Sequence, residues 1–404
     1  MRVLMLAELY RPYIGGTEEY VRNLAHGLSE RGHEVSVATI GPPDRPTLED
    51  DDGVRVHRLA GSIQRASALM PSGRPYAPPL PDPLLVRGLQ KVLKQERPEI
   101  VHAHNWLVDS FLPLKGNSQA RLVMTMHDTG LVCAKRTFVY RGRVCSGPEL
   151  AKCLHCAAAQ YGTVRGPLVT LANWAMRAPN LGAVDLFVPV SQAVADATEL
   201  EQRGARYEVL PNFVPDDVVR QADDTDPALA ALPKEPFWLY VGALSRDKGI
   251  HIMLDAYRGV AGAPPLVVIG REIPGWKPDF PAGVVVLHDL AHSAVMAAWR
   301  RAAVGFIPSM CPDSCPTVAI EAMACAVPIV ASRTGGLPEL VVDGTTGTLV
   351  PPGSVDALRQ AMDNIVRGEV KLARMGKAAK RRAPEFMATR VVGRMEQLYA
   401  QVAG

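Results

Sequence analysis

Short apolar stretches alternate with longer stretches of helical periodicity along most of the chain. In the first half, the apolar stretches predict β-strands at Val3–Ala7, Glu34–Thr39, Val54–Arg58, Ile100–Ala103, Leu122–Met126 and Leu186–Val190. Apolar residues recur with helical spacing over about 17–31 and 83–96. Strands that alternate with helices in this way predict a parallel sheet built from β-α-β units.

The same alternation starts again in the second half. Its predicted strands are Trp238–Gly242, Pro265–Ile269, Val284–Leu287, Val304–Ile307 and Ile329–Ala331, and its predicted helices cover about 251–260, 293–301, 318–325 and 355–367. Residues 216–236, rich in Asp, Ala and Pro, form the predicted linker. We therefore expect an α/β protein with two doubly wound domains, whose ligands bind at the carboxyl ends of the strands in a shared cleft.

Two long segments interrupt the first half. Residues 41–82 are rich in Pro and Asp and are too long for a simple connection, so we interpret them as a substrate-facing loop. Residues 129–182 form a second insertion, which contains four cysteines.

Composition narrows the class of protein. A chain of 404 residues fits two domains of about 200 residues each. The net charge of +3 gives no general case for nucleic-acid binding. Basic residues gather between 371 and 382, which favours a solvated helix face, with peripheral membrane contact as the alternative.

No stretch reaches the 18 or so apolar residues that span a bilayer, and the first apolar segment is too short for a signal peptide. We expect a cytoplasmic protein whose cysteines are thiols or metal ligands.

The segment PDSCPTVAIEAMA carries two carboxylates, Asp313 and Glu321, at the start of a predicted helix. A helix start offers unpaired N–H groups and a favourable dipole for phosphate oxygens. Carboxylates beside such a site suit a ligand that also carries hydroxyl groups. Phosphate and hydroxyl groups together indicate a sugar nucleotide. The alternative is that Asp313 caps the helix and that Glu321 lies on the surface.

Two further turns can approach a phosphate. Gly15 and Gly16 form a tight turn before a helix that begins near Thr17, the predicted N-cap, although no third glycine completes a dinucleotide fingerprint. Arg246 and Lys248, in VGALSRDKG, can grip a diphosphate. The alternatives are an ordinary strand–helix connection and two solvated cations.

Three histidines end predicted strands, in VHAHNW and TMHD. They are His102, His104 and His127, and we expect them to point into the cleft. Metal binding by His102 and His104 is the alternative, but the sequence shows no clear third ligand.

The insertion also predicts a metal site. Cys133, Cys145, Cys153 and Cys156 end in a C-x2-C pair and match a tetrahedral thiolate zinc site of structural type. The alternatives are an iron–sulfur cluster, a disulfide pair or four free thiols. Of the other cysteines, Cys315 is expected to line the ligand site and Cys325 to lie in the core.

Nine segments, read together, resemble a known family. They are GGTEEYVRNLAHGLSERGHEVSV, PEIVHAHNW, LVMTMHD, VPVSQAVAD, LPNFV, YVGALSRDKG, PDSCPTVAIEAMA, ASRTGGLPELV and VDGTTGTLVPPG, in that order over nearly the whole chain. The chain resembles the retaining glycosyltransferases of family 4, which have the two-Rossmann GT-B fold, and within them a subgroup with a four-cysteine insert.

The resemblance implies three regions. Residues 1–212 form a Rossmann-like acceptor domain with the insert 129–182, residues 213–385 form the domain that binds the nucleotide-sugar donor, and residues 386–404 form a helix that packs back on the first domain.

The resemblance also implies the roles of individual residues. Gly15 and Gly16 lie beside the donor diphosphate, His127 touches the donor sugar, and Lys248 pairs with the diphosphate. Asp313 binds sugar hydroxyls and Glu321 binds the ribose. The remaining implied donor contacts are Arg246, Ser314, Cys315, Pro316, Thr317 and Val318, with backbone amides of Thr317 and Val318 receiving oxygens.

Three departures from the family pattern leave the donor sugar open. Asp313 stands where the family has Glu, Ala243 stands where it has Arg, and Cys315-Pro316 replaces Phe-Gly. Proline has no N–H to donate to a sugar.

The implied reaction transfers a sugar from a nucleoside diphosphate sugar, such as a UDP- or GDP-sugar, to an acceptor hydroxyl with retention. Helix-end amides and Lys248 stabilise the leaving phosphate, and no divalent ion is needed. The acceptor is expected near residues 61–82, including Tyr76, near 104–106 and near the insert, and it is a small molecule, a glycan or a lipid-linked sugar. The alternatives are a sugar-nucleotide epimerase of the same fold and a catalytically silent sugar-nucleotide-binding protein.

Overall fold

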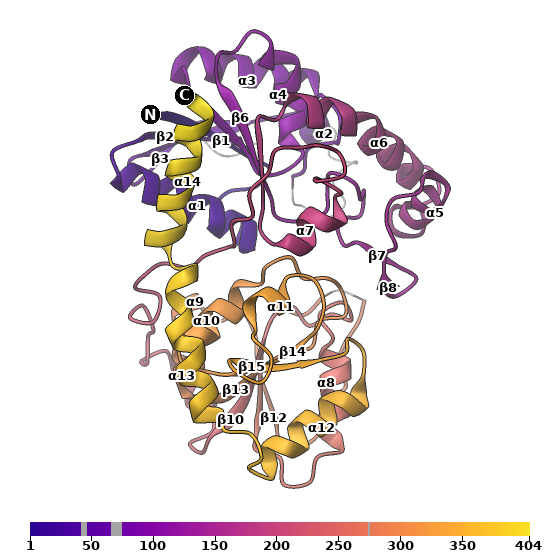
Figure 1. Cartoon of the computed structure of the whole chain (residues 1–404), viewed down its shortest axis with the longest axis vertical. Coiled ribbons are helices and arrows are strands. Elements are labelled where there is room, and N and C mark those ends of the chain that lie inside the picture. Colours follow the sequence, from indigo (N-terminus) through magenta and orange to yellow (C-terminus); the bar gives the residue numbers. More distant parts are fainter. Residues whose placement is uncertain (42–46, 66–74, 274) are drawn as a thin grey trace. The chain divides into compact units, whose positions relative to one another are not determined.

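The computed structural model describes residues 1–41, 47–65, 75–273 and 275–404. The chain forms two compact units (Figure 1). The first unit comprises Met1–Tyr140, Cys145–Pro211 and Val391–Gly404, and the second comprises Arg141–Val144 and Asn212–Arg390. Part of the predicted loop 41–82, namely residues 42–46 and 66–74, lies outside the described residues.

The first unit contains a seven-stranded sheet with the order β3-β4-β2-β1-β5-β6-β9. Its strands are β1 (Arg2–Ala7), β2 (Glu34–Ile40), β3 (Leu48–Asp51), β4 (Val54–Leu59), β5 (Ile100–Ala103), β6 (Arg121–Met126) and β9 (Leu186–Pro189). All neighbours pair in parallel except β3, which is antiparallel to β4. The buried strands carry nearly continuous apolar side chains because helices cover both faces of a parallel sheet.

The first unit also contains several described helices. They are α1 (Gly16–Glu30), α2 (Ser62–Arg65), α3 (Pro83–Glu96), α4 (Leu107–Lys115), α5 (Leu150–Tyr161), α6 (Arg165–Ala183), α7 (Gln192–Ala197) and most of α14 (Ala388–Ala403). The start of α3 shows how the sequence sets a boundary, because the Asp82 side chain accepts from the amides of Leu84 and Leu85, and Pro83 occupies the first helical position. A short hairpin, β7 (Val139–Tyr140) and β8 (Arg143–Val144), precedes α5.

The second unit contains a parallel six-stranded sheet with the order β12-β11-β10-β13-β14-β15. Its strands are β10 (Phe237–Val241), β11 (Leu266–Ile269), β12 (Val284–Leu287), β13 (Ala302–Ile307), β14 (Ile329–Ser332) and β15 (Gly347–Val350). Its helices are η2 (Pro227–Ala231), α8 (Ile250–Arg258), α9 (His292–Arg301), α10 (Thr317–Ala324), α11 (Leu337–Leu340), α12 (Val355–Val366), α13 (Leu372–Arg382) and η3 (Ala383–Phe386). One core cluster, which includes Trp238, Met253 and Phe306, lies between one face of this sheet and helices α8 and α12.

The strand orders confirm the predicted doubly wound α/β architecture. In each sheet the order reverses beside the first strand, between β1 and β5 in the first unit and between β10 and β13 in the second. Ligands of open α/β sheets bind at the carboxyl ends of the strands at this reversal. Most predicted strands agree with the observed ones within two residues.

Several elements differ from the prediction. No helix was predicted in insertion 129–182, most of which is a pair of packed helices, α5 and α6 (Figure 1). Strand β3 escaped prediction because its sequence, LEDD, is polar and lies at the edge of the sheet. Helix α1 begins at Gly16 with Gly15 as its N-cap, so the prediction of Thr17 as the N-cap was wrong. None of the described helices combines the length and the apolar character that crossing a bilayer requires.

Candidate functional site

Two loops of the second unit meet where its sheet order reverses. One follows β10 and the other follows β13. The carbonyl oxygen of Asp247 in the first loop accepts from the amides of Met310 and Cys311 in the second, at 2.8 and 3.2 Å. Gly249 has a φ of 71°, and a Cβ at this position would overlap the carbonyl oxygen of Pro308. The close contact of the two loops therefore depends on a glycine here.

An ion pair joins these loops at the centre of the candidate site. The Lys248 ammonium contacts the Asp313 carboxylate, which also accepts a hydrogen bond from the Ser309 hydroxyl. Burial lowers the pKa of Lys248, but the Asp313 charge more than reverses this effect, so the pKa is raised overall. Lys248 is therefore charged at neutral pH, and its side chain is 37% exposed. The arrangement holds one accessible cation in a fixed position.

A glycine turn supports the backbone of Asp313. The amide of Gly336 donates to the carbonyl oxygen of Asp313 at 2.7 Å. Gly335 has a φ of 56°, and a Cβ there would overlap that same oxygen. The RTGG turn thus fixes the loop that carries Asp313.

Helix α10 begins directly after this loop. Its N-cap is Pro316, without a side-chain cap, so the alternative of Asp313 as the N-cap is excluded. The first amides of the helix, on Thr317 and Val318, have no acceptor within the helix and carry the positive end of its dipole. The Asn212 side-chain amide donates to the Cys315 carbonyl at 2.7 Å and holds the preceding turn.

The second carboxylate of the motif is buried. Glu321 is 5% exposed, so the alternative of a surface position is excluded as well. Its Oε1 lies 3.0 Å from Nε2 of His292, the first residue of α9. No sequence motif pointed to His292, because its position depends on how α9 packs beside α10. Glu321 thus lies one turn inside the helix whose amides face the site.

The other predicted residues of the second unit differ in burial. Cys315 is buried, and burial raises its pKa to about 12, so it is a neutral thiol. Ser314 is half-buried on the same loop. Arg246 is exposed, with its guanidinium 5.4 Å from the ring centre of Trp276. Cys325 is only partly buried, so the prediction that it belongs to the core was wrong.

In the first unit, the predicted glycines begin α1. A Cβ at Gly15 would lie 2.5 Å from the carboxylate of Glu18, whereas a Cβ at Gly16 would have nothing within 4 Å. Of the two glycines, only Gly15 has a neighbour that a Cβ would meet, and that neighbour is the movable end of the Glu18 side chain.

His127 lies in a cluster of rings. Its Nε2 is 3.1 Å from Nδ1 of His104, and its ring meets Tyr20 of α1 edge-on at 4.7 Å between ring centres. Burial lowers the pKa of His104 well below its usual range, so His104 is neutral. Its Nε2 is buried, and no described residue bonds to it. His104 and Tyr20 therefore orient His127, and sequence reasoning missed the role of Tyr20.

His102 faces the core. Its Nδ1 is 2.6 Å from the hydroxyl of Tyr399, and its Nε2 is 2.7 Å from that of Thr125. Burial and the nearby His127 lower its pKa to about 3. The prediction that His102 points into a cleft was wrong, because both ring nitrogens have buried structural partners.

The loop after β6 is held by Arg136. Its guanidinium donates to Glu8 at 2.7 and 3.1 Å and lies 3.9 Å from the ring centre of Trp106. The Trp106 indole in turn donates to the Gly130 carbonyl at 3.1 Å. These contacts fix the residues that follow His127.

The four cysteines of the insertion do not converge. Their positions are Cys133, Cys145, Cys153 and Cys156. Within the part of the chain that the structure describes, no three of these sulfurs lie within 4.8 Å of one another. The thiols of Cys145 and Cys156 instead donate to the carbonyls of Gly147 and Val139. A tetrahedral metal site would require these side chains to move together.

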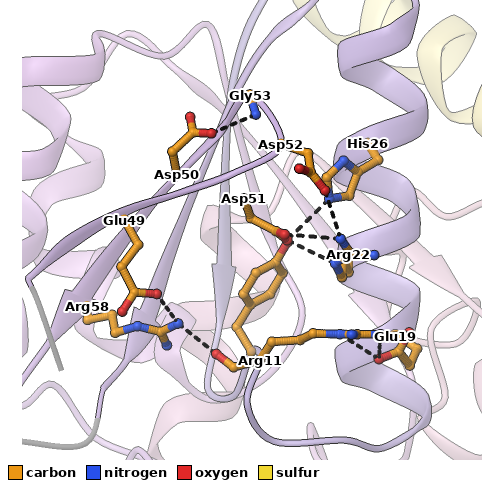
Figure 2. Close-up of polar contacts among 11 residues, drawn as sticks. Arg11, Glu19, Arg22, His26, Glu49, Asp50, Asp51, Asp52, Gly53 and Arg58 are labelled. Carbon is orange, nitrogen blue, oxygen red and sulfur yellow. Dashed lines mark hydrogen bonds and ion pairs between the residues drawn. The ribbon is translucent and has the colours of Figure 1, made fainter. Parts of the chain in front are cut away.

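A separate polar cluster ties the edge of the first sheet to α1 (Figure 2). Asp51 accepts from Arg22 at 2.9 and 3.0 Å and from Tyr10 at 2.7 Å, and it lies 3.2 Å from His26. Burial raises the pKa of Asp51, but these hydrogen bonds outweigh burial, so the pKa is well below its usual range. His26, Asp51 and Asp52 have the spacing of a metal site, but Arg22 already pairs with both carboxylates. We interpret it as a structural brace.

Two family models match the chain. Residues 14–218 match the model described as Glycosyltransferase Family 4, and residues 222–382 match the model described as Glycosyl transferases group 1. Together they cover both units.

Curated relatives and solved structures extend over nearly the same length. The chain is 26% identical to a glycogen synthase of Mycobacterium tuberculosis (strain ATCC 25618 / H37Rv), over 95% of this chain and 90% of that protein. It is 27% identical to a D-inositol 3-phosphate glycosyltransferase of Arthrobacter sp. (strain FB24), over 92% and 86%.

Among solved structures, sucrose-phosphate synthase from Thermosynechococcus elongatus has a TM-score of 0.74 at 21% identity, over 100% of this chain and 99% of that one. Anabaena HepE in complex with UDP and glucose has a TM-score of 0.69 at 17% identity, over 99% and 100%. These likenesses establish the fold as GT-B, two Rossmann-like units.

Proposed function

Because the chain belongs to glycosyltransferase family 4, it is a glycosyltransferase, and we propose that it transfers a sugar from a nucleoside diphosphate sugar to an acceptor hydroxyl with retention of configuration. The names of the similar proteins support the use of an activated sugar, since HepE was solved with UDP and with UDP-glucose. The observation that carries the proposal is the cation of Lys248, held by Asp313 beside the first amides of α10.

The donor would bind the second unit through its diphosphate. Lys248 supplies a fixed positive charge, and the amides of Thr317 and Val318 supply donors that require no reorganisation. Asp313 accepts from sugar hydroxyls, and Glu321, oriented by His292, accepts from the ribose. Arg246, whose guanidinium lies 5.4 Å from the ring centre of Trp276, would also pair with the diphosphate.

In the proposed reaction, negative charge develops on the leaving phosphate. The bond between the anomeric carbon and the phosphate oxygen breaks, and the acceptor oxygen forms a bond to the same face of that carbon. The acceptor proton passes to the leaving phosphate, whose negative charge the α10 amides and Lys248 stabilise. His127 would contact the donor sugar near the reacting carbon, and the turn at Gly15 and Gly16 would lie beside the diphosphate.

We propose that the acceptor binds the first unit beside His127. The Trp106 ring, stacked on Arg136, offers an apolar platform of the kind that packs against sugar rings. Tyr76, also predicted to contact the acceptor, is held by Arg165, whose guanidinium lies 5.3 Å from its ring centre. We further propose a cytoplasmic location, where nucleotide sugars are available, and no need for a divalent ion.

A screen of nucleoside diphosphate sugars tests donor binding. The correct donor at 100 times its Kd should raise the free energy of unfolding by about 2.7 kcal/mol, which a thermal-shift assay detects. Glu321→Ala should weaken this binding. If no nucleotide sugar shifts the transition, the donor proposal is wrong.

Kinetics of a lysine variant test the role of the cation. Lys248→Ala should lower kcat/KM by about 100-fold or more, because the leaving charge loses its fixed counterion. The matched control is Lys234→Ala, an exposed lysine of the same unit, which should leave kcat/KM unchanged. Transfer at the wild-type rate by Lys248→Ala would contradict the site assignment.

An epimerised sugar nucleotide formed without acceptor would identify an epimerase instead, and tight donor binding without transfer or donor hydrolysis would identify a silent binding protein.

Zinc binding by Cys133, Cys145, Cys153 and Cys156 stays a prediction. We expect about one equivalent of zinc in protein purified without chelator, with the sulfurs drawn together around the ion. Elemental analysis measures this content. Less than about half an equivalent of zinc or iron would remove the metal hypothesis.

A further inference from the structure

One carboxylate contacts the chain on both sides of the turn that begins α1. The turn is made by Gly15 and Gly16. Tyr10 lies before it, and the Tyr10 hydroxyl donates to Asp51 at 2.7 Å. Arg22 of α1 lies after it and donates to the same carboxylate at 2.9 and 3.0 Å (Figure 2). We call Tyr10, Asp51 and Arg22 the Asp51 clamp, because the two sides of the turn cannot separate without breaking one of these hydrogen bonds.

A second pair of residues joins the same two sides. The Arg11 guanidinium, before the turn, donates to the Glu19 carboxylate, in the first turn of α1, at 3.0 to 3.2 Å (Figure 2). The carbonyl oxygen of Arg11 also accepts from Nη2 of Arg58 in β4 at 2.7 Å, which ties the segment before the turn to the sheet. The backbone of Gly15 and Gly16 is therefore held from both sides.

The two pairs differ in exposure. The side chains of Arg11 and Glu19 are 49% and 34% exposed, and exposed ion pairs contribute little because water and salt screen them. Tyr10 is buried, and the Asp51 side chain is 24% exposed. Burial and the hydrogen bond to Asp51 raise the pKa of Tyr10, so its hydroxyl keeps the proton that it donates. The Asp51 clamp is therefore the stronger of the two connections.

The Asp51 clamp does more than fix the edge of the sheet. Contacts of Asp51 with Arg22, and with His26 at 3.2 Å, suffice to hold β3 against α1. Tyr10 belongs to neither element, yet it buries a polar hydroxyl in order to reach Asp51. The contact of Tyr10 therefore serves the segment that leads into the turn.

We propose that Asp51 is a positioning residue for the donor, because through Tyr10 and Arg22 it sets the position of the turn at Gly15 and Gly16. The inference rests on the proposed function, in which the donor diphosphate lies beside this turn. Asp51 acts through the two residues that it binds and not by contact with the donor. A turn held in place requires no ordering when the diphosphate arrives, whereas a loosened turn must be ordered in each catalytic cycle.

Steady-state kinetics with donor and acceptor varied separately test the proposal. Asp51→Ala should lower kcat/KM for the donor by about tenfold or more and leave KM for the acceptor unchanged. A variant that is only less stable would not separate the two substrates in this way. Tyr10→Phe removes one hydroxyl and keeps the pair of Asp51 with Arg22, so it should fold even where Asp51→Ala does not, and it should lower kcat/KM for the donor by about threefold.

The matched control is Asp185→Ala. The Asp185 side chain is also 24% exposed, and its carboxylate accepts from Lys115 and from the amide of Leu122 at 2.7 Å each. Asp185 precedes β9 and so lies at the amino end of the strand, whereas ligands bind at the carboxyl ends. The control should lower the free energy of unfolding and leave kcat/KM for the donor unchanged. Equal loss of donor use in Asp51→Ala and Asp185→Ala would overturn the proposal.

Hydrogen exchange tests the Asp51 clamp without donor or transfer. The amides of Tyr13 and Glu19 lie on either side of the turn and donate to the carbonyls of Tyr10 and Gly15 at 3.1 and 3.0 Å. Both amides should exchange about tenfold faster in Asp51→Ala than in the wild type, and at the wild-type rate in the control.

The two measurements separate this inference from the proposed function. Unchanged exchange in Asp51→Ala would overturn the inference even if donor use fell. Faster exchange with unchanged donor use would overturn it as well, because the turn would then not position the donor. If the wild-type protein transfers sugar from no nucleotide sugar, the proposed function fails, and exchange alone decides whether Asp51 holds the turn.

Discussion

At the scale of single residues, two glycines show two separate reasons why a position can require glycine. Gly335 and Gly344 both have a positive φ, 56° and 72°, but their surroundings differ. A Cβ on Gly335 would overlap the backbone of Asp313, whereas a Cβ on Gly344 would have nothing within 4 Å. Only at Gly335 does the absence of a side chain also allow two chain segments to meet.

This contrast predicts the cost of two matched substitutions. Gly344→Ala should lower the free energy of unfolding by about 1 kcal/mol, through backbone strain alone. Gly335→Ala should cost about 3 kcal/mol or more, because the Asp313 loop must also move. Urea denaturation measures both values. Equal costs for the two variants would show that the close approach to Asp313 contributes nothing.

At the scale of elements, the packing of α4 against α6 buries a carboxyl group. Asp109 of α4 is 1% exposed and accepts from Nδ2 of the Asn180 side-chain amide, while the amide oxygen Oδ1 of Asn180 is buried without a described partner. Burial raises the pKa of Asp109 to about 7, partly offset by the hydrogen bond from Asn180. The two helices therefore enclose a carboxyl group that, in the unfolded chain, would lose its proton near the ordinary Asp pKa of about 4.

The sign of the pH dependence follows from this difference. The folded protein keeps the proton of Asp109 up to about pH 7, and the unfolded chain releases it near pH 4, so this group lowers stability as pH rises between these values. Asp109→Asn should raise the free energy of unfolding by about 2–4 kcal/mol at pH 8 and change it little at pH 4, since the new amide can also donate to Asn180. Denaturation at both pH values measures the gain. The exposed Asp196→Asn is the control, and a gain at pH 4 as large as that at pH 8 would contradict the mechanism.

At the scale of the whole molecule, the chain completes its first unit with its last helix. Val391, Met395, Leu398 and Tyr399 of α14 are buried in that unit, and the Tyr399 hydroxyl contacts His102. The second unit has its own core around Trp238. Stability of the first unit therefore depends on residues that follow the whole second unit in the sequence.

Shortening the chain should affect the two units differently. Removal of residues 391–404 takes several side chains from the core, each worth about 1.5–3 kcal/mol, and together they approach the whole stability of a domain. Hydrogen exchange should show loss of amide protection in β1, β5 and β6 and retained protection in β10 and β13. Met395→Ala should cost about 2–5 kcal/mol and the exposed Val366→Ala much less. Unchanged protection in β1 after truncation would contradict this view.

The sequence predicted which residues belong to the candidate site better than it predicted which residues contact one another there. Asp313, Lys248 and Glu321 were identified from short motifs, because a turn before a helix and its charged residues are local in sequence. The ion pair of Lys248 with Asp313 joins residues 65 positions apart, and the contact of Glu321 with His292 joins two helices. Motifs carry no information about such partners.

The sequence alone determined the alternation of strands and helices, the doubly wound class and the glycine turns, because each depends on periodicity or on backbone freedom within a few residues. Tertiary structure decided that His102 faces the core, that no three of the four insertion thiols lie within 4.8 Å of one another, and that α6 turns its polar residues inward. These outcomes depend on which distant groups satisfy buried donors and acceptors, and only the folded chain brings those groups together.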